Sequence, residues 1–321
     1  MTNKIILVNG DPNSINSEII YKCWKKLNIN IKKKIYLISN YELISQQFKK
    51  LKINIKLKKL KNIDENTNSN MLNIINIPLN FSDPFNVPSN KVSNYVIQSL
   101  ILAHKLALKK KVKGIINCPV NKKLIKISNK VGVTEFLASK CKINKNSEVM
   151  MIHNKNFSVV PLTTHINIKN VYKKINKALI LKKISTLNRF FNILFKKKPK
   201  IGILGLNPHN SELSKKSEEI RIIIPAITIL KKRGIKISGP LVPDTLFIND
   251  YKKYDVVVGM YHDQVLTPFK TLFHFNAINI TLGLKYIRVS PDHGPAKDLI
   301  KQNKANCQSL YQCIKFINHL K

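Results

Sequence analysis

The chain has 321 residues, of which 44% are hydrophobic and 7% aromatic, a composition typical of a globular protein rather than a disordered one. Its five cysteines are widely spaced, and no apolar stretch approaches the roughly 18–20 residues that a membrane-spanning helix needs. These features argue against a secreted, disulfide-rich or membrane protein and predict a cytoplasmic one. The net charge is +39, but only four of the 56 basic residues are Arg, the side chain that specific nucleic-acid sites favour, so no specific nucleic-acid partner is predicted.

The first half of the chain predicts alternating strands and helices. Short apolar runs predict buried strands, and apolar residues at helical spacing predict the helices that follow them. The predicted strands are residues 4–10, 35–39 and 112–118, and the predicted helices are residues 16–27, 41–51 and 92–109. The opening β-α-β-α order is typical of a parallel sheet covered by helices. The Lys- and Asn-rich segment 53–70 predicts an edge hairpin or a loop.

The second half continues this alternation. Two apolar runs on either side of the turn at residues 154–156 predict a β-hairpin. The hairpin strands are residues 148–153 and 157–163, the predicted helices are 168–196 and 217–232, and the further strands are 201–206, 235–238, 255–260 and 277–282. The whole pattern therefore predicts an α/β fold.

Three histidines directly follow predicted strands: His165, His209 and His262. Ligands of α/β sheets bind beyond the carboxyl ends of the strands, so these side chains form a candidate divalent-metal set, with Asp263 as a neighbouring carboxylate. Their spacings of 44 and 53 residues are no local metal signature. From the pattern alone, three hydrogen-bonded loop histidines remain the alternative.

Further polar residues gather in three turns or segments. Lys270 and Arg288 are candidates for binding an anionic substrate, and Arg288 is the more informative because the chain contains so few Arg. The turn at Gly10-Asp11 follows the first predicted strand, where many nucleotide-binding folds hold phosphate, but it lacks the G-x-G-x-x-G pattern. The cluster Asp292-His293-Gly294 is a second such turn.

Nine segments, in this order, resemble the 4-hydroxythreonine-4-phosphate dehydrogenase family, and together they cover nearly the whole chain. They are GDPNSINSEI from Gly10, NCPVNKKLI from Asn117, GVTEFLA from Gly132, TTHINIKNV from Thr163, GLNPHNSE from Gly205, SEEIRIIIPAI from Ser217, GPLVPDTLF from Gly239, YDVVVGMYHDQ from Tyr254 and INITLGLKYIRVSPDHGPA from Ile278. The last three are the most specific.

The resemblance implies a fold and an assembly. It implies two α/β/α domains around a cleft, similar to the isocitrate and isopropylmalate dehydrogenases, in a homodimer. By this resemblance the first domain comprises residues 1–128 plus 295–321 and contains both termini, and the second comprises residues 129–294.

The resemblance also implies the roles of individual residues. His165, His209 and His262 are expected to bind one divalent ion (Zn²⁺, Mg²⁺, Co²⁺ or Mn²⁺) at the dimer interface, with His262 supplied by the other subunit. Thr134, Lys270, Asn279 and Arg288 match substrate-binding positions, and Lys270, Asp263 and Asp244 match catalytic positions. The residues matching the loops that hold NAD or NADP are Gly10, Asp11, Asp292, His293, Gly294 and Ala296.

The implied reaction is the oxidation of 4-phosphohydroxy-L-threonine by NAD or NADP. The product, 2-amino-3-oxo-4-phosphohydroxybutyrate, would lose carbon dioxide to give 3-amino-2-oxopropyl phosphate, in pyridoxal 5′-phosphate biosynthesis. Within this reaction, Lys270 is expected either to bind the carboxylate or phosphate of the substrate or to transfer a proton.

The chain departs from the family pattern at three places, one of which is Asn210-Ser211-Glu212 after His209, where the family has Ala-Gly-Glu. Val133 stands where the family has a substrate-binding His, and Ser14, Asn16 and Ser17 stand where it has Gly, Gly and Pro. These departures keep two alternatives open. One is a dehydrogenase of another phosphorylated four-carbon hydroxy acid, such as threonate or erythronate 4-phosphate. The other is a catalytically degenerate basic protein that binds RNA.

Overall fold

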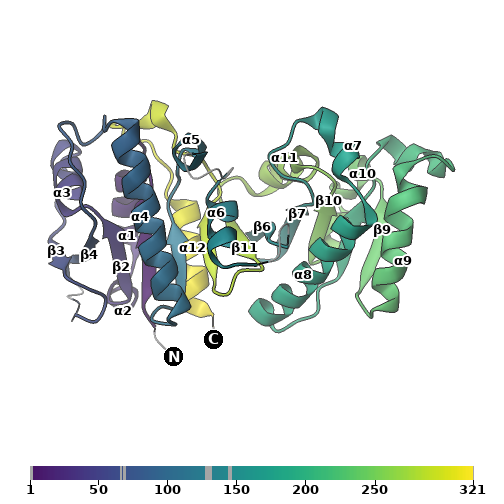
Figure 1. The fold of residues 1–321 in the computed structure, drawn as a ribbon, viewed down its shortest axis with the longest axis horizontal. Helices are drawn as coiled ribbons and strands as arrows, with labels where there is room; N and C mark the ends of the chain where they lie inside the picture. The colour runs from purple at the N-terminus through teal and green to yellow at the C-terminus, as the bar shows by residue number, and fades with distance from the viewer. Residues whose placement is uncertain (1–2, 66, 68–69, 127–131, 144–146, 321) are drawn as a thin grey trace. The chain divides into compact units, whose positions relative to one another are not determined.

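Strands and helices alternate along the chain in two units, residues 1–141 with 284–321 (unit 1) and residues 142–283 (unit 2) (Figure 1). The structure, a computed structural model, describes residues 3–65, 67, 70–126, 132–143 and 147–320. The expected domain boundary after residue 128 lies outside the described residues. The expected boundary at 295 differs from the observed division at 284, because β12 (Arg288–Pro291) pairs with β5 (Gly114–Asn117) of unit 1.

The sheet of unit 1 is parallel throughout. Its other strands are β1 (Ile5–Val8), β2 (Ile35–Ser39), β3 (Leu57–Leu60) and β4 (Leu72–Asn76), and the order is β3-β4-β2-β1-β5-β12. Every residue of β1 and β2 is buried, as expected for strands covered on both faces. The segment predicted as an edge hairpin or loop contributes instead the parallel edge strand β3.

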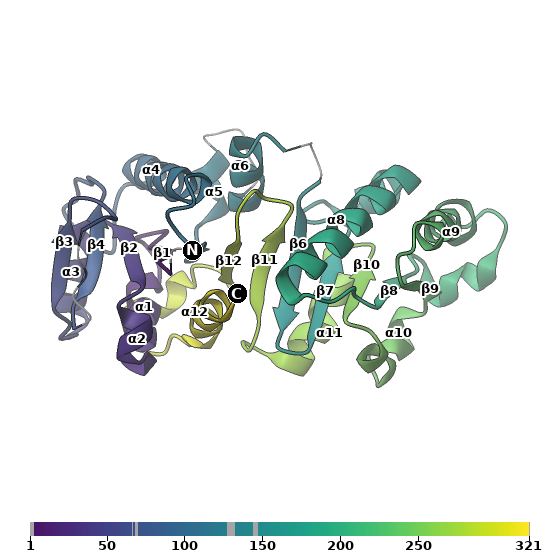
Figure 2. The same ribbon diagram turned by 90° about the horizontal axis from the view of Figure 1, so that it is seen from below.

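Helices cover both faces of this sheet. They are α1 (Asn16–Lys26), α2 (Ile29–Lys32), α3 (Tyr41–Lys50), α4 (Ser89–Leu108), α5 (Lys122–Lys126), α6 (Val133–Lys140), the 3-10 helix η5 (Lys297–Leu299) and α12 (Gln308–His319). Figure 2 shows α4 on one face and α1 with α12 on the other. The C-terminal helix α12 therefore completes the same layer as the first helix of the chain.

The sheet of unit 2 combines antiparallel and parallel pairing. Its strands are β6 (Val149–Asn154), β7 (Phe157–Pro161), β8 (Ile201–Leu204), β9 (Ile237–Leu241), β10 (Val256–Gly259) and β11 (Ile278–Leu282), in the order β11-β6-β7-β10-β8-β9. The hairpin β6–β7 and the pair β11–β6 are antiparallel, whereas β7, β10, β8 and β9 run parallel. The predicted α/β class is confirmed, and the carboxyl ends of β7, β10 and β8 lie at one edge.

The helices of unit 2 pack on both faces of its sheet, α8 and α9 on one and α11 on the other (Figure 2). They are η1 (Ile168–Asn170), α7 (Val171–Lys174), α8 (Lys177–Phe195), η2 (Pro208–Leu213), the π-helix η3 (Glu219–Ile223), α9 (Ile224–Lys232), α10 (Pro243–Leu246), η4 (Asp250–Lys253) and α11 (His262–Phe273). Phe269 of α11 stacks on Phe157 of β7, with ring centroids 6.0 Å apart, and fixes this helix on the sheet.

Among the helices in the described part of the chain, none combines the length and the apolar character that crossing a membrane requires.

His153 in β6 gives the fold a dependence on pH. Its Nδ1 lies 2.9 Å from Ser158 Oγ, and burial lowers the pKa of the imidazole to about 4, whereas its ordinary value is near 6.5. Between these two values the unfolded chain binds a proton that the folded chain does not, so stability falls as pH decreases from about 6.5 to about 4. The loss amounts to at most about 3 kcal/mol.

We expect the variant His153→Gln to lack this pH-dependent loss of stability. Urea unfolding at pH 7 and at pH 4 gives the free energy of unfolding of parent and variant, and the parent should lose more of it between the two pH values. Equal losses in parent and variant would show that folding does not lower the pKa of His153.

Candidate active site

Three parallel strands of unit 2 each lead into a loop or helix that carries one of the predicted metal ligands. His165 follows β7, His262 is the first residue of α11 after β10, and His209 lies in η2 after β8. Because β10 lies between β7 and β8, all three histidines follow neighbouring strand ends. The rings of His165 and His262 are adjacent, with centroids 5.6 Å apart.

Carboxylates accompany two of these histidines. Asp263 Oδ1 lies 2.6 Å from His262 Nδ1, so an Nδ1–H would donate to the carboxylate and leave Nε2 available as a ligand. Asp244 Oδ2 lies 3.9 Å from His209 Nε2. A carboxylate that holds a ligating imidazole in place is the usual second partner of a histidine at a metal.

The donor chemistry of this edge fits a divalent cation. Imidazole and carboxylate are the ligands of Zn²⁺ and of similar ions, and His165 and His262 already lie side by side. Across the described residues, however, no group of three or more His, Cys, Asp or Glu side chains forms a single centre. The structure thus brings His165 and His262 together and keeps His209 beside Asp244.

Two of the predicted substrate-binding residues also belong to unit 2. Lys270 is on α11, eight residues after His262 and hence about 12 Å further along the helix axis. Asn279 is in β11, and its buried Oδ1 has no hydrogen-bond partner in the described part of the chain. A buried amide oxygen is nearly always paired, so this atom suits a donor group from a ligand.

The other two, Thr134 and Arg288, contact each other in unit 1. Arg288 Nε donates to Asn117 Oδ1 at 2.6 Å, and Nη1 donates to Thr134 Oγ1 at 3.2 Å. Burial lowers the pKa of Arg288 to about 10, which still leaves the guanidinium charged at neutral pH. Val133, at the start of α6 beside Thr134, is half-buried and offers no hydrogen-bonding atom. Asn117 belongs to the motif NCPVNKKLI, but no role was predicted for it from the sequence.

The two predicted cofactor turns lie at the same edge of the unit 1 sheet. Gly10-Asp11 follows β1, Asp292–Ala296 follows β12, and the backbone N–H of Ile15 donates to the Pro295 carbonyl at 3.2 Å. Within the second turn, Asp292 N donates to Ser309 Oγ, His293 Nδ1 lies 3.0 Å from Gly294 O, and Ala296 adopts a left-handed conformation with φ of 43°. Burial raises the pKa of Asp11, opposed by the Asn13 N–H and by the charge of Lys297.

The turn after β1 is closed by its own side chains. Gly10 has a φ of +78°, and a Cβ there would lie 2.7 Å from the Pro119 carbonyl oxygen, so only glycine fits. Asn16 Nδ2 donates to the carbonyls of Asn9 at 2.6 Å and Pro119 at 2.8 Å, and Ser14 Oγ donates to Asp11 O. The residues that replace the family's glycines thus tie β1 to the end of β5.

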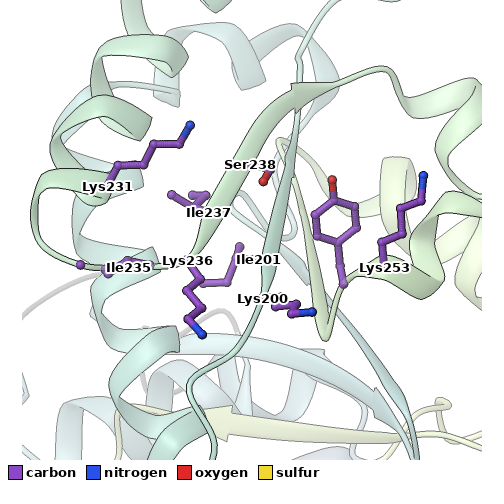
Figure 3. Close-up of a pocket in the computed structure, with 10 residues that line it drawn as sticks. Lys200, Ile201, Lys231, Ile235, Lys236, Ile237, Ser238 and Lys253 are labelled. Atoms are coloured by element: carbon purple, nitrogen blue, oxygen red, sulfur yellow. The ribbon is translucent and has the colours of Figure 1, made fainter.

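Two cavities lie in different parts of the chain. In unit 1 a cavity of about 410 Å³ is lined by Asp11, Asn13, Ser89, Asn90, Ser93, Asn121, Lys123, Leu124 and Lys297. In unit 2 a cavity of about 460 Å³ lies beside β8 and β9 (Figure 3). Lys200, Lys231, Lys236 and Lys253 line it, but none of the predicted site residues does. Of these two cavities in the described residues, the one in unit 1 is lined by a predicted site residue, Asp11.

Comparison with known proteins shows which family the chain resembles. The family described as pyridoxal phosphate biosynthetic protein PdxA matches residues 31–317. A protein of Sulfurihydrogenibium sp. named 4-hydroxythreonine-4-phosphate dehydrogenase is 37% identical, over 99% of this chain and 98% of its own. One of Salmonella typhimurium named D-threonate 4-phosphate dehydrogenase is 30% identical, over 99% of each. The crystal structure of 4-hydroxythreonine-4-phosphate dehydrogenase from Klebsiella pneumoniae superposes with a TM-score of 0.85 at 29% identity, over 98% of each chain.

The turn after β1 allows a test against the family pattern. Asn16→Gly restores the family residue, yet we expect it to lower the free energy of unfolding by about 2–4 kcal/mol, because it leaves two buried carbonyls without their donor and places glycine in a helix. Denaturant unfolding measures the change. Asn90→Gly, an exposed position in the first turn of α4, is the matched control and should cost about 1 kcal/mol or less. A loss at Asn16 no larger than that of the control would contradict the role given to its amide.

Proposed function

The chain belongs to the family of the pyridoxal phosphate biosynthetic protein PdxA, and we propose that it oxidises 4-phosphohydroxy-L-threonine with NAD or NADP and with a divalent metal ion. The observation that carries this proposal is the meeting of three histidine-bearing strand ends at one edge of the unit 2 sheet. As a 4-hydroxythreonine-4-phosphate dehydrogenase, the protein would form a 3-oxo acid that then loses carbon dioxide to give 3-amino-2-oxopropyl phosphate.

Residues of unit 2 are assigned to metal binding and to proton transfer in this oxidation. His165, His209 and His262 would hold Zn²⁺, Mg²⁺, Co²⁺ or Mn²⁺, and Asp263 orients His262. When bound, the ion would polarise the substrate hydroxyl, and the nicotinamide would accept the hydride. Asp244, exposed beside His209, is the carboxylate that we assign to accept the hydroxyl proton.

Three side chains are assigned to the anionic and polar groups of the substrate. Arg288 offers a charged guanidinium, held by Asn117 and Thr134, to the phosphate. Lys270 is set well along α11 from His262, which favours a role in binding an anionic group over proton transfer at the reacting carbon. The unpaired Oδ1 of Asn279 would accept a hydrogen bond from the substrate.

The cofactor is assigned to the strand-end edge of unit 1. Asp11 and Asn13 of the turn after β1 line the cavity of about 410 Å³ there, and so does Lys297, the residue that follows the turn Asp292–Ala296. Its lining supplies the N-terminus of the 20-residue helix α4, together with Lys123 and Lys297, and these groups suit the phosphates of NAD or NADP.

Assembly and location stay predictions. We expect a homodimer in the cytoplasm, with His262 contributed to the metal site of the other subunit. Within one chain the rings of His165 and His262 are adjacent, so His262 lies near the edge from which it would reach the other subunit.

A second candidate substrate is D-threonate 4-phosphate. The name of the Salmonella typhimurium relative at 30% identity suggests it, and Val133, which stands in place of the family's substrate-binding His, is the position at which a change of substrate would be marked. The two substrates share the phosphate and differ at the carbon that carries the amino group.

The proposal is tested by following reduced cofactor with 4-phosphohydroxy-L-threonine before chelation, after it, and after return of each metal. We expect turnover that chelation abolishes and metal restores. His165→Ala, His209→Ala and His262→Ala should each lower kcat/KM by at least about 100-fold, whereas His274→Ala, exposed at the end of α11, should not. No turnover and no metal binding would overturn the enzyme reading and favour the RNA-binding alternative.

Val133 provides a separate test of substrate choice. If 4-phosphohydroxy-L-threonine is the substrate, Val133→His adds a charge-assisted contact worth about 1.5–3 kcal/mol. The KM of the variant for this substrate should then be roughly 10- to 100-fold lower than that of the parent. Michaelis constants of parent and variant for both substrates measure this. A parent that uses D-threonate 4-phosphate better, with no gain from the histidine, would establish the second candidate instead.

A further inference from the structure

Gln264 joins two of the histidine-bearing strand ends. Its Oε1 accepts from the backbone N–H of Met260 at 2.7 Å, at the end of β10, and its Nε2 donates to the Gly205 carbonyl at 2.8 Å, at the end of β8. One carboxamide thus touches the segment before His262 and the segment before His209. Met260 is 4 residues from Gln264 in the chain and Gly205 is 59 residues from it, so the bond to Gly205 is a tertiary interaction.

Thr163 extends the connection to the third strand end. Its Oγ1 and its backbone N–H both donate to the Met260 carbonyl, at 2.7 and 3.2 Å, two residues before His165. Both backbone polar groups of Met260 are therefore hydrogen-bonded: its N–H donates to Gln264, and its carbonyl accepts from Thr163. A continuous path of hydrogen bonds runs Thr163–Met260–Gln264–Gly205.

The surrounding backbone leaves room for this path. Gly259 has no Cβ, and one built there would lie 2.6 Å from Val265 and 3.0 Å from Gln264 Oε1. Gly205 is equally constrained, because a Cβ there would collide with Asn210 Oδ1. Met260 is fully buried and Thr163 is 6% exposed, so water does not compete readily for these bonds.

Helix capping accounts for only half of the Gln264 contacts. Gln264 is the third residue of α11, and a Gln there commonly reaches back to a backbone N–H before the helix. The bond to Gly205 satisfies no group of α11. Its effect is to fix the end of β8, and with it the start of the segment that carries His209.

We propose that Gln264 and Thr163 are positioning residues: they fix the strand ends that carry His165 and His209 relative to the strand end that carries His262, so that each histidine is set for metal binding, His262 toward the site of the other subunit. This inference rests on the proposed function, since it assigns the three histidines to a metal. The polar atoms of both side chains bond backbone groups, so neither residue is assigned to the substrate or the ion. An amide and a hydroxyl carry no charge at neutral pH, so they fix geometry without competing for the cation.

The test measures metal affinity and ligand geometry rather than turnover. The probe is Co²⁺, followed by its visible absorption and by competition with a chelator, on the full-length protein and its variants. We expect Gln264→Met to raise the Kd for Co²⁺ by roughly 10- to 100-fold and to shift the absorption band. Gln264→Glu keeps the acceptor for Met260 N–H and loses the donor to Gly205, so it should also alter the band if the bond to β8 matters.

Thr163 supplies variants that keep the proposal testable if Gln264→Met does not fold. Thr163→Val should weaken Co²⁺ binding, and Thr163→Ser, which retains the hydroxyl, should restore it. Thr271→Val on the exposed side of α11 is the matched control, because its hydroxyl bonds only within the helix. If the parent binds Co²⁺ and the variants have the same Kd and absorption spectrum, the positioning role is overturned but the proposed function is not. A parent that binds no metal overturns the proposed function with it.

Discussion

The arrangement of unit 2 depends on the parallel pairing of β10 with β7 on one side and β8 on the other. The register sets Val257 opposite Val159 and opposite Gly202, so the three strands end at nearly the same level. Parallel strands carry their carboxyl ends to one edge, and this places three loops from distant parts of the chain next to each other. Without that pairing, His165, His209 and His262 would have no common surface.

Both units use amide side chains to secure such an edge. In unit 2 Gln264 links β10 to β8, and in unit 1 Asn16 links β1 to the end of β5. An amide can donate and accept at once and carries no charge to desolvate, so it satisfies backbone groups where the ladder stops. The buried contact between Asn117 and Arg288 follows the same principle, since it holds a guanidinium without neutralising it.

The sequence was most informative where one local pattern decides the outcome. The fully buried run IILV and the amphipathic helix near residues 92–109 formed as expected, because apolar spacing alone specifies them. Two elements were not predicted from the sequence: α11, which contains Pro268 and begins with polar residues, and β12, a four-residue strand that begins with Arg288 and ends with Pro291. The strand-end histidines could be predicted from the sequence, but the order of the strands could not. β10 follows β8 in the chain yet lies between β7 and β8, and that order comes from tertiary packing.

The departures from the family pattern are of two physical kinds. At Ser14 and Asn16 the new side chains fill the space of the lost glycines and form hydrogen bonds within unit 1, so the fold absorbs the change. At Val133 the new side chain is aliphatic and cannot replace a hydrogen bond to a ligand. A substitution that the fold compensates says little about the substrate. One that leaves a polar ligand group without its partner bears directly on substrate choice, and among these positions only Val133 is of that kind.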